Sequence, residues 1–131
     1  MNEKEIVKRT GISRLMYTLV HSSNGVKWLV KNEAAFQQEL ILFVPLTVIA
    51  LWLDIPAMHT LAIMLSMMFV LFAEMTNTAI EAVVDRVGLD YHELSGVAKN
   101  VGSAIVTLSL WCGAWCYLPI FHKIINVIGK S

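Results

Sequence analysis

Four polar residues are spaced so that a helix would carry all of them on one face: Glu74, Asn77, Glu81 and Asp85. At about 100° per residue, their successive positions fall within an arc of about 80°. The segment from Glu74 to Asp85 contains no basic residue. Carboxylates with an interposed amide are groups that hold a metal ion or transfer a proton. The alternative is a row of solvated charges at the point where a helix leaves a membrane.

The segment before these residues suggests how deep they lie. An uncharged run extends from Ile55 to Ala73, and about 20 apolar residues are enough to cross a bilayer. A carboxylate at the bilayer centre costs roughly 2.5–3.5 kcal/mol, so acids at the edge of such a run indicate function. A helix from Pro56 to Asp85 would be about 45 Å long, against about 30 Å of hydrocarbon. We therefore expect Glu74 near the membrane boundary, where a lipid hydroxyl could meet a phosphate donor from water.

The composition is typical of a small integral membrane protein. Of 131 residues, 56% are hydrophobic and 15% are charged. We expect an all-α membrane protein with one membrane domain over residues 1–131. It would have a surface helix at about residues 6–31 and transmembrane helices at about 33–53, 56–86 and 97–122. Gly88, Ser95 and Gly96 predict a loop between the last two spans.

The predicted surface helix has an apolar stripe with the helical spacing i, i+3, i+4, i+7, formed by Ile12, Leu15, Met16 and Leu19. Basic residues and His21 flank this stripe, which is typical of a helix lying on a membrane surface. The alternative is a helix of this kind packed against protein.

Basic residues are distributed unequally over the expected membrane sides. Six of the ten lie before the first span, Arg86 and Lys99 lie next to the connection between the last two spans, and only Lys123 and Lys130 lie elsewhere. The positive-inside rule then predicts a multi-pass protein with a cytoplasmic N-terminus. Nothing in the sequence suggests a nucleic-acid partner. Three helices per chain cannot enclose a site alone, which favours an oligomer.

Several segments resemble the prokaryotic diacylglycerol kinase family. They are Asn32-Glu-Ala-Ala-Phe36, Ala79-Ile-Glu-Ala-Val-Val-Asp-Arg86 and Tyr91-His-Glu-Leu-Ser-Gly96, together with Glu74, Asn77 and Lys99. The resemblance runs from about Gly11 into the third span. It implies a homotrimer in the bacterial inner membrane that uses ATP and magnesium (Mg²⁺) to phosphorylate a lipid alcohol.

The resemblance also implies roles for individual residues. Glu74 would be the catalytic base, and Glu33 and Glu81 would bind Mg²⁺. Nucleotide contacts would come from Arg14, His21, Glu33, Asn77, Glu81, Asp90, His92, Lys99 and Asn100. Lipid contacts would come from Arg14, Ala35, Glu39, Glu74 and Ser103. Two positions depart from the family pattern, because Asn100 replaces an Asp and His21 replaces a Tyr.

We therefore predict phosphorylation of diacylglycerol to phosphatidic acid at the membrane–cytoplasm interface. One alternative is an undecaprenol kinase of the same fold. From a different class, the alternative is a small transporter or proton-channel subunit that uses the carboxylates as a relay.

Overall fold

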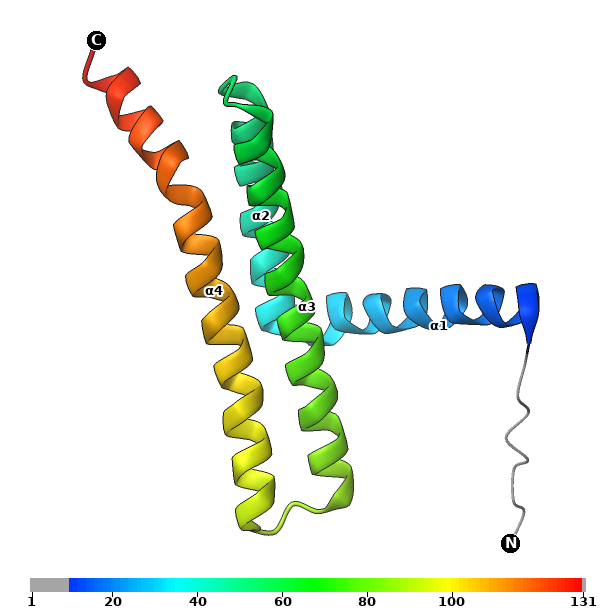
Figure 1. Ribbon diagram of the computed structural model, residues 1–131. Coiled ribbons are helices and arrows are strands. Elements are labelled where there is room, and N and C mark those ends of the chain that lie inside the picture. The colour runs from blue at the N-terminus through cyan, green and yellow to red at the C-terminus, as the bar shows by residue number, and fades with distance from the viewer. Residues whose placement is uncertain (1–9, 131) are drawn as a thin grey trace, which may run out of the picture. The chain divides into compact units, whose positions relative to one another are not determined.

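The computed structural model describes residues 10–130 of the protein, and its regular elements are all α-helices (Figure 1). These are α1 (Gly11–Asn32), α2 (Ala34–Trp52), α3 (Ala57–Val87) and α4 (Glu93–Ile128). The predicted all-helical class is confirmed. The chain divides into two compact units, the first ending at Ala34 and the second beginning at Ala35.

The first unit contains α1, which is a single helix of 22 residues. The apolar residues predicted to lie on a membrane surface are exposed, with Ile12 at 79% and Leu19 at 66% of full exposure. The helix ends where Glu33 adopts an extended backbone, with φ −103° and ψ 109°. Exposure of the stripe does not show what it faces, so the amphipathic surface helix stays a prediction.

In the second unit, α3 and α4 form an antiparallel pair that packs side by side along most of its length (Figure 1). The buried residues of α3 are spaced by three and four positions, and those of α4 by four and seven. This is the spacing of a coiled-coil seam. Small residues at several of these positions let the two backbones approach closely. The seam residues are Ile63, Ser66, Val70 and Ala73 of α3, and Gly102, Ser109, Gly113 and Ile120 of α4.

All three helices of this unit meet near the α2–α3 turn. Ala50 of α2, Ile63 of α3 and Ile120 of α4 form one buried apolar cluster. At the turn itself, Lys123 Nζ donates a 2.7 Å hydrogen bond to the backbone carbonyl of Asp54. These contacts join the C-terminal part of α4 to the α2–α3 turn.

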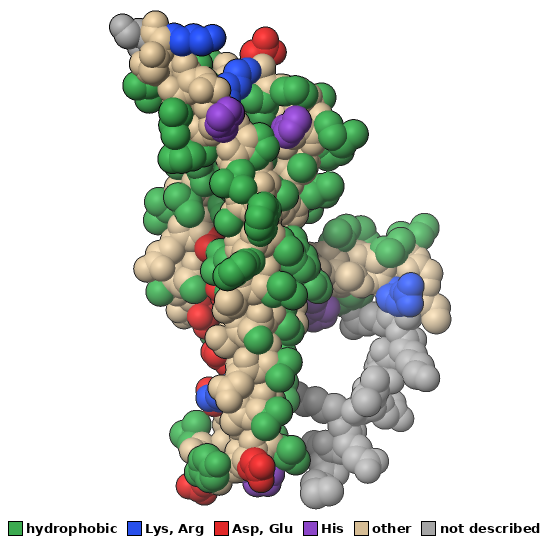
Figure 2. Space-filling model, turned by 60° about the vertical axis from the view of Figure 1, so that its left-hand side comes forward, with side chains coloured by type: hydrophobic (Ala, Val, Ile, Leu, Met, Phe, Trp, Pro, Cys, Tyr) green, Lys and Arg blue, Asp and Glu red, His purple; other side chains and the backbone are tan. Residues whose placement is uncertain are grey.

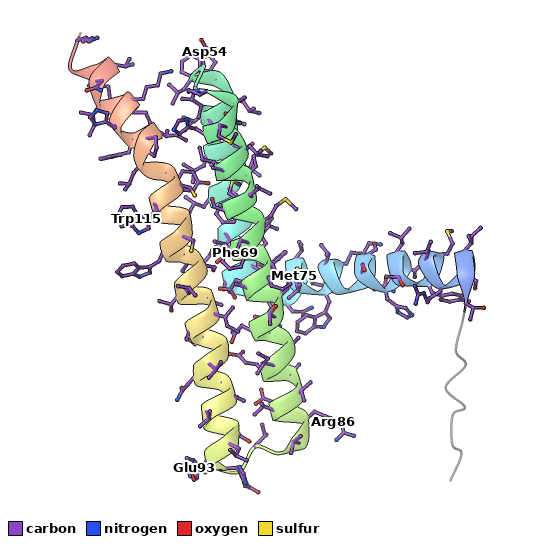
Figure 3. The ribbon with its side chains drawn as sticks, viewed as in Figure 1. Asp54, Phe69, Met75, Arg86, Glu93 and Trp115 are labelled. Carbon is purple, nitrogen blue, oxygen red and sulfur yellow. The ribbon has the colours of Figure 1, made fainter. Side chains whose placement is uncertain are left out.

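The two ends of the helical pair differ in character. Figure 3 places Asp54 at one end, and Arg86 and Glu93 at the opposite end. Apolar side chains cover much of the visible face of this unit, whereas acidic side chains follow one edge of its lower half (Figure 2). The polar groups of α3 are therefore gathered toward the end that carries Arg86.

Three helices are long and apolar enough to cross a membrane: Ala34–Trp52, Ala57–Val87 and Glu93–Ile128. At 1.5 Å per residue, α3 is about 46 Å long and α4 about 54 Å. Both exceed a hydrocarbon core of about 30 Å, so each has more than one turn to spare outside the bilayer.

The connection between α3 and α4 is shorter than the predicted loop. Ser95 and Gly96, expected in that loop, lie in the first turn of α4, which begins at Glu93. His92 caps this helix, because its Nδ1 accepts a 3.2 Å hydrogen bond from the Leu94 backbone N–H. Histidine is not among the preferred capping residues, so the sequence gives only a weak signal for a helix start at this position. The helix predicted over 97–122 is consequently longer at both ends.

Candidate active site

The predicted polar face of α3 is present, and its residues differ in exposure. Glu74, Asn77 and Glu81 are half-buried, whereas Asp85 is exposed. The axial positions of these residues follow from the helix rise: Glu74 lies about 26 Å from Ala57, and Glu81 about 10 Å further along. The polar face thus begins close to one hydrocarbon thickness from the start of the helix.

Asn77 continues the α3 seam, four residues after Ala73, and contacts groups on both helices. Its Nδ2 donates a 3.2 Å hydrogen bond to Oε1 of Glu81. Its Oδ1 is buried against Gly102 of α4 and has no hydrogen-bond partner. Asn77 therefore lies between the backbone of α4 and the carboxylate of Glu81.

One acid of the polar face has a basic partner that the sequence analysis did not anticipate. Lys99 Nζ of α4 contacts Asp85 Oδ1 at 2.7 Å, and the negative charge of Glu81 also acts on Lys99. The helical pair brings together two residues that are 14 positions apart. The segment from Glu74 to Asp85 contains no basic residue, and the partner of Asp85 comes from the neighbouring helix α4.

The predicted base has a carboxyl neighbour on another helix. The Glu39 carboxyl of α2 lies in hydrogen-bonding contact with the Glu74 carboxyl of α3. The second oxygen of Glu39, Oε2, is buried without a partner. Carboxyl groups of two different helices therefore face each other at this point of the structure.

An apolar groove of about 350 Å³ lies between α2 and α3 next to these two carboxyl groups. Leu40, the residue after Glu39, is at this end of the lining, and so is Leu71, one turn before Glu74. The groove lining is Leu40, Phe43, Val44, Thr47, Val48, Met64, Met67, Met68 and Leu71. A chain of methylene groups is the kind of ligand that fits such a lining.

A second hollow, of about 500 Å³, lies at the α3–α4 connection. Asp90 and His92, both predicted to contact the nucleotide, line it together with Val84, Tyr91 and Ser95. Its lining combines aromatic, aliphatic and polar groups, which is typical of small-molecule sites.

The remaining predicted residues are divided between the two units. Arg14, His21 and Glu33 belong to the first unit, and Glu81 belongs to the second. The pairing of Glu33 with Glu81 as metal ligands therefore stays a prediction. Within residues 10–130, no three acidic, His or Cys side chains are grouped as a metal cluster. Three other predicted residues are exposed in the second unit, namely Ala35 on α2, and Asn100 and Ser103 on α4.

Sequence reasoning missed the contact of Gly102 with Asn77 and the ion pair between Asp85 and Lys99. The coiled-coil spacing of α3 and α4 indicates which faces of the two helices meet, but it does not determine their register, on which both contacts depend.

Three apolar helices and a polar face with an adjoining apolar groove define a multi-pass membrane protein with a site for an amphiphilic ligand. The family model described as prokaryotic diacylglycerol kinase matches residues 20–121. The chain belongs to this family, and the predicted resemblance and kinase class are confirmed.

Individual relatives agree with this assignment. The chain is 43% identical over 115 residues to the diacylglycerol kinase of Escherichia coli (strain K12), an alignment that covers 86% of this chain and 94% of the relative. It is 38% identical over 103 residues to that of Haemophilus influenzae, covering 79% and 87%. It is 36% identical over 102 residues to that of Pseudomonas aeruginosa, covering 78% and 83%.

Proposed function

We propose that this protein transfers the γ-phosphoryl group of ATP to the primary hydroxyl of diacylglycerol, which yields phosphatidic acid. The observation that supports this most directly is the position of Glu74. It lies between an apolar groove on the α2 side and the polar cluster of Asn77, Glu81 and Lys99 further along α3 and α4. A lipid alcohol and a water-borne phosphate donor would approach this carboxyl from opposite directions.

In the proposed reaction, Glu74 accepts the proton of the lipid hydroxyl as that oxygen attacks the γ-phosphorus in line. The bond between the γ-phosphorus and the bridging oxygen breaks, and ADP leaves. Glu39 contacts Glu74 and is next to the groove, so its carboxyl is placed to contact the glycerol part of the lipid. Arg14, Ala35 and Ser103 complete the proposed lipid contacts.

We assign nucleotide binding to the polar end of the helical pair. Lys99 would meet phosphate oxygens, and the hollow lined by Asp90 and His92 would receive the nucleoside. Asn77, Glu81 and Asn100 lie on the same two helices, and Arg14, His21 and Glu33 would contribute from the first unit.

The donor set of Glu81 fits Mg²⁺. Carboxylate oxygens are the ligands this ion prefers, and the half-buried Glu81 has a fixed neighbour in Asn77. We propose that Glu33 and Glu81 hold Mg²⁺ with the nucleotide. When bound, the ion would offset the negative charge of the phosphates.

We further propose a homotrimer in the bacterial inner membrane with a cytoplasmic N-terminus. The charge distribution supports this orientation. Three membrane-length helices per chain cannot enclose a site alone, which supports assembly of several subunits around the site.

Lipid-dependent release of ADP by the purified protein tests the function. We expect release with diacylglycerol, little with undecaprenol, and none above background in the Glu74→Gln variant. Greater turnover of undecaprenol would change the proposed substrate. Absence of ADP release with both lipids would favour the transporter alternative.

A further inference from the structure

The contact between Gly102 and Asn77 leaves no space for a larger residue on α4 unless the Asn77 side chain shifts. A methyl group at position 102 would overlap Asn77 Oδ1 and lie 3.4 Å from Asn77 Cγ. The absence of a side chain at residue 102 is therefore what permits Asn77 to occupy the seam. Both residues are in the interior of their helices, where α3 and α4 pack against each other.

This contact also limits how the Asn77 amide is oriented. Oδ1 lies against the α4 backbone, and Nδ2 points to Glu81 Oε1 at 3.2 Å. The reversed amide would present an oxygen to the Glu81 carboxylate, and two acceptors in contact repel each other. The seam thus supports one amide orientation, in which Asn77 donates to Glu81.

We propose that Gly102 and Asn77 are positioning residues for the carboxylate of Glu81. Close approach of α4 at Gly102 holds the Asn77 amide, and the amide holds Glu81 in the orientation that receives the divalent cation. The inference rests on the proposed function, in which Glu81 binds Mg²⁺. It adds a way in which the packing of α4 against α3 controls the proposed metal site at Glu81. Lys99 lies one turn before Gly102, so the same helix also carries the lysine cation next to this site.

Gly113 provides a matched control on the same helix. It is also buried in the seam and faces α3, but a methyl group there would meet Val70 Cγ2 at 3.8 Å, which is an ordinary contact. The substitutions Gly102→Ala and Gly113→Ala are therefore chemically identical and differ in what the new methyl group meets.

The test measures Mn²⁺ binding to the full chain by electron paramagnetic resonance, with a non-hydrolysable ATP analogue present. Removal of a group that orients a metal ligand typically lowers metal affinity about 10- to 100-fold. We expect Gly102→Ala and Asn77→Ala each to raise the Kd for Mn²⁺ by about this factor. Gly113→Ala should leave the Kd within about two-fold, as a substitution without a clash permits.

A double substitution separates positioning from packing. If Gly102 acts through Asn77, the double variant Asn77→Ala/Gly102→Ala should bind Mn²⁺ no more weakly than the single variant Asn77→Ala. In the double variant the methyl group at residue 102 has no Asn77 amide to overlap. Additive losses would overturn the inference. If Gly102→Ala does not fold, Asn77→Ala decides, and an unchanged Kd in that variant overturns the inference.

The Glu81→Gln variant shows whether a negative result disproves the positioning role of Gly102 and Asn77 or the metal-binding role of Glu81. Weaker Mn²⁺ binding in Glu81→Gln, with normal binding in Asn77→Ala, would overturn only the positioning role. Normal binding in both variants would overturn the role of Glu81 as well.

Discussion

Substitution of Asp85 should strengthen nucleotide binding. Lys99 Nζ contacts Asp85 Oδ1 at 2.7 Å, yet the two side chains are 44% and 49% exposed. Ion pairs this accessible to water contribute little, because solvation of the separated charges nearly balances their attraction. A phosphate group would therefore displace Asp85 from Lys99 at small cost, and Asp85→Asn would remove that cost.

The expected change is a decrease in the KM for MgATP of about 1.5- to 5-fold, the range that corresponds to an exposed pair. The kcat should stay close to that of the unmodified protein, because Asp85 is not in the proposed proton-transfer path. The assay is ADP release at saturating diacylglycerol over a range of ATP concentrations. Higher ionic strength should reduce the difference, since salt screens exposed charges.

Asp54→Asn is the matched control for this substitution. It removes the same charge at the opposite end of the helical pair, where Figure 3 places Asp54. Lys123 contacts only the backbone carbonyl of that residue. We expect no change in the KM for MgATP in this variant. An unchanged or increased KM in Asp85→Asn, or an equal decrease in Asp54→Asn, would refute competition between Asp85 and phosphate for Lys99.

Four further outcomes are expected. Glu74→Gln should lower kcat by roughly 10²–10⁴-fold with MgATP binding retained, and near-normal kcat would exclude Glu74 as the base. Glu81→Gln should weaken MgATP binding as well as turnover, and unaltered titration of the nucleotide would contradict its assigned role. Asn100→Asp should raise kcat or lower the KM for MgATP if a negative charge beside Lys99 helps to orient the nucleotide, and lower activity would show that it does not. In a background without the native cysteines, an external thiol reagent should label Lys130→Cys and spare Asp90→Cys, and the opposite pattern would reverse the proposed orientation.

The helices were predictable because their signals are local. Apolar length indicated the three candidate spans, and the spacing from Glu74 to Asp85 placed their side chains on one face of α3. The start of α4 was misplaced because its cap, His92, is not a preferred capping residue, and because Ser95 and Gly96 indicated a loop.

The contacts across helices could not be obtained in this way. Pairing of Asp85 with Lys99 depends on the register of α3 against α4, which periodicity within one helix does not determine. Contact of Glu39 with Glu74 depends on how α2 lies against α3. Each helix indicates which of its faces is apolar, but the neighbour that this face meets is set by packing.

The linkage of α4 to the α2–α3 turn makes the depth of Glu74 depend on the thickness of the bilayer. Because Lys123 and the Ala50–Ile63–Ile120 cluster link α4 to the α2–α3 turn, these helices would shift or tilt in the membrane as one body. Glu74 lies about 26 Å from the start of α3, a fixed length that the helix cannot stretch. In a thicker bilayer Glu74 would lie inside the hydrocarbon region, and in a thinner bilayer it would lie outside it, unless the helices change their tilt. Turnover should therefore pass through a maximum as the acyl chains of the host lipid are lengthened.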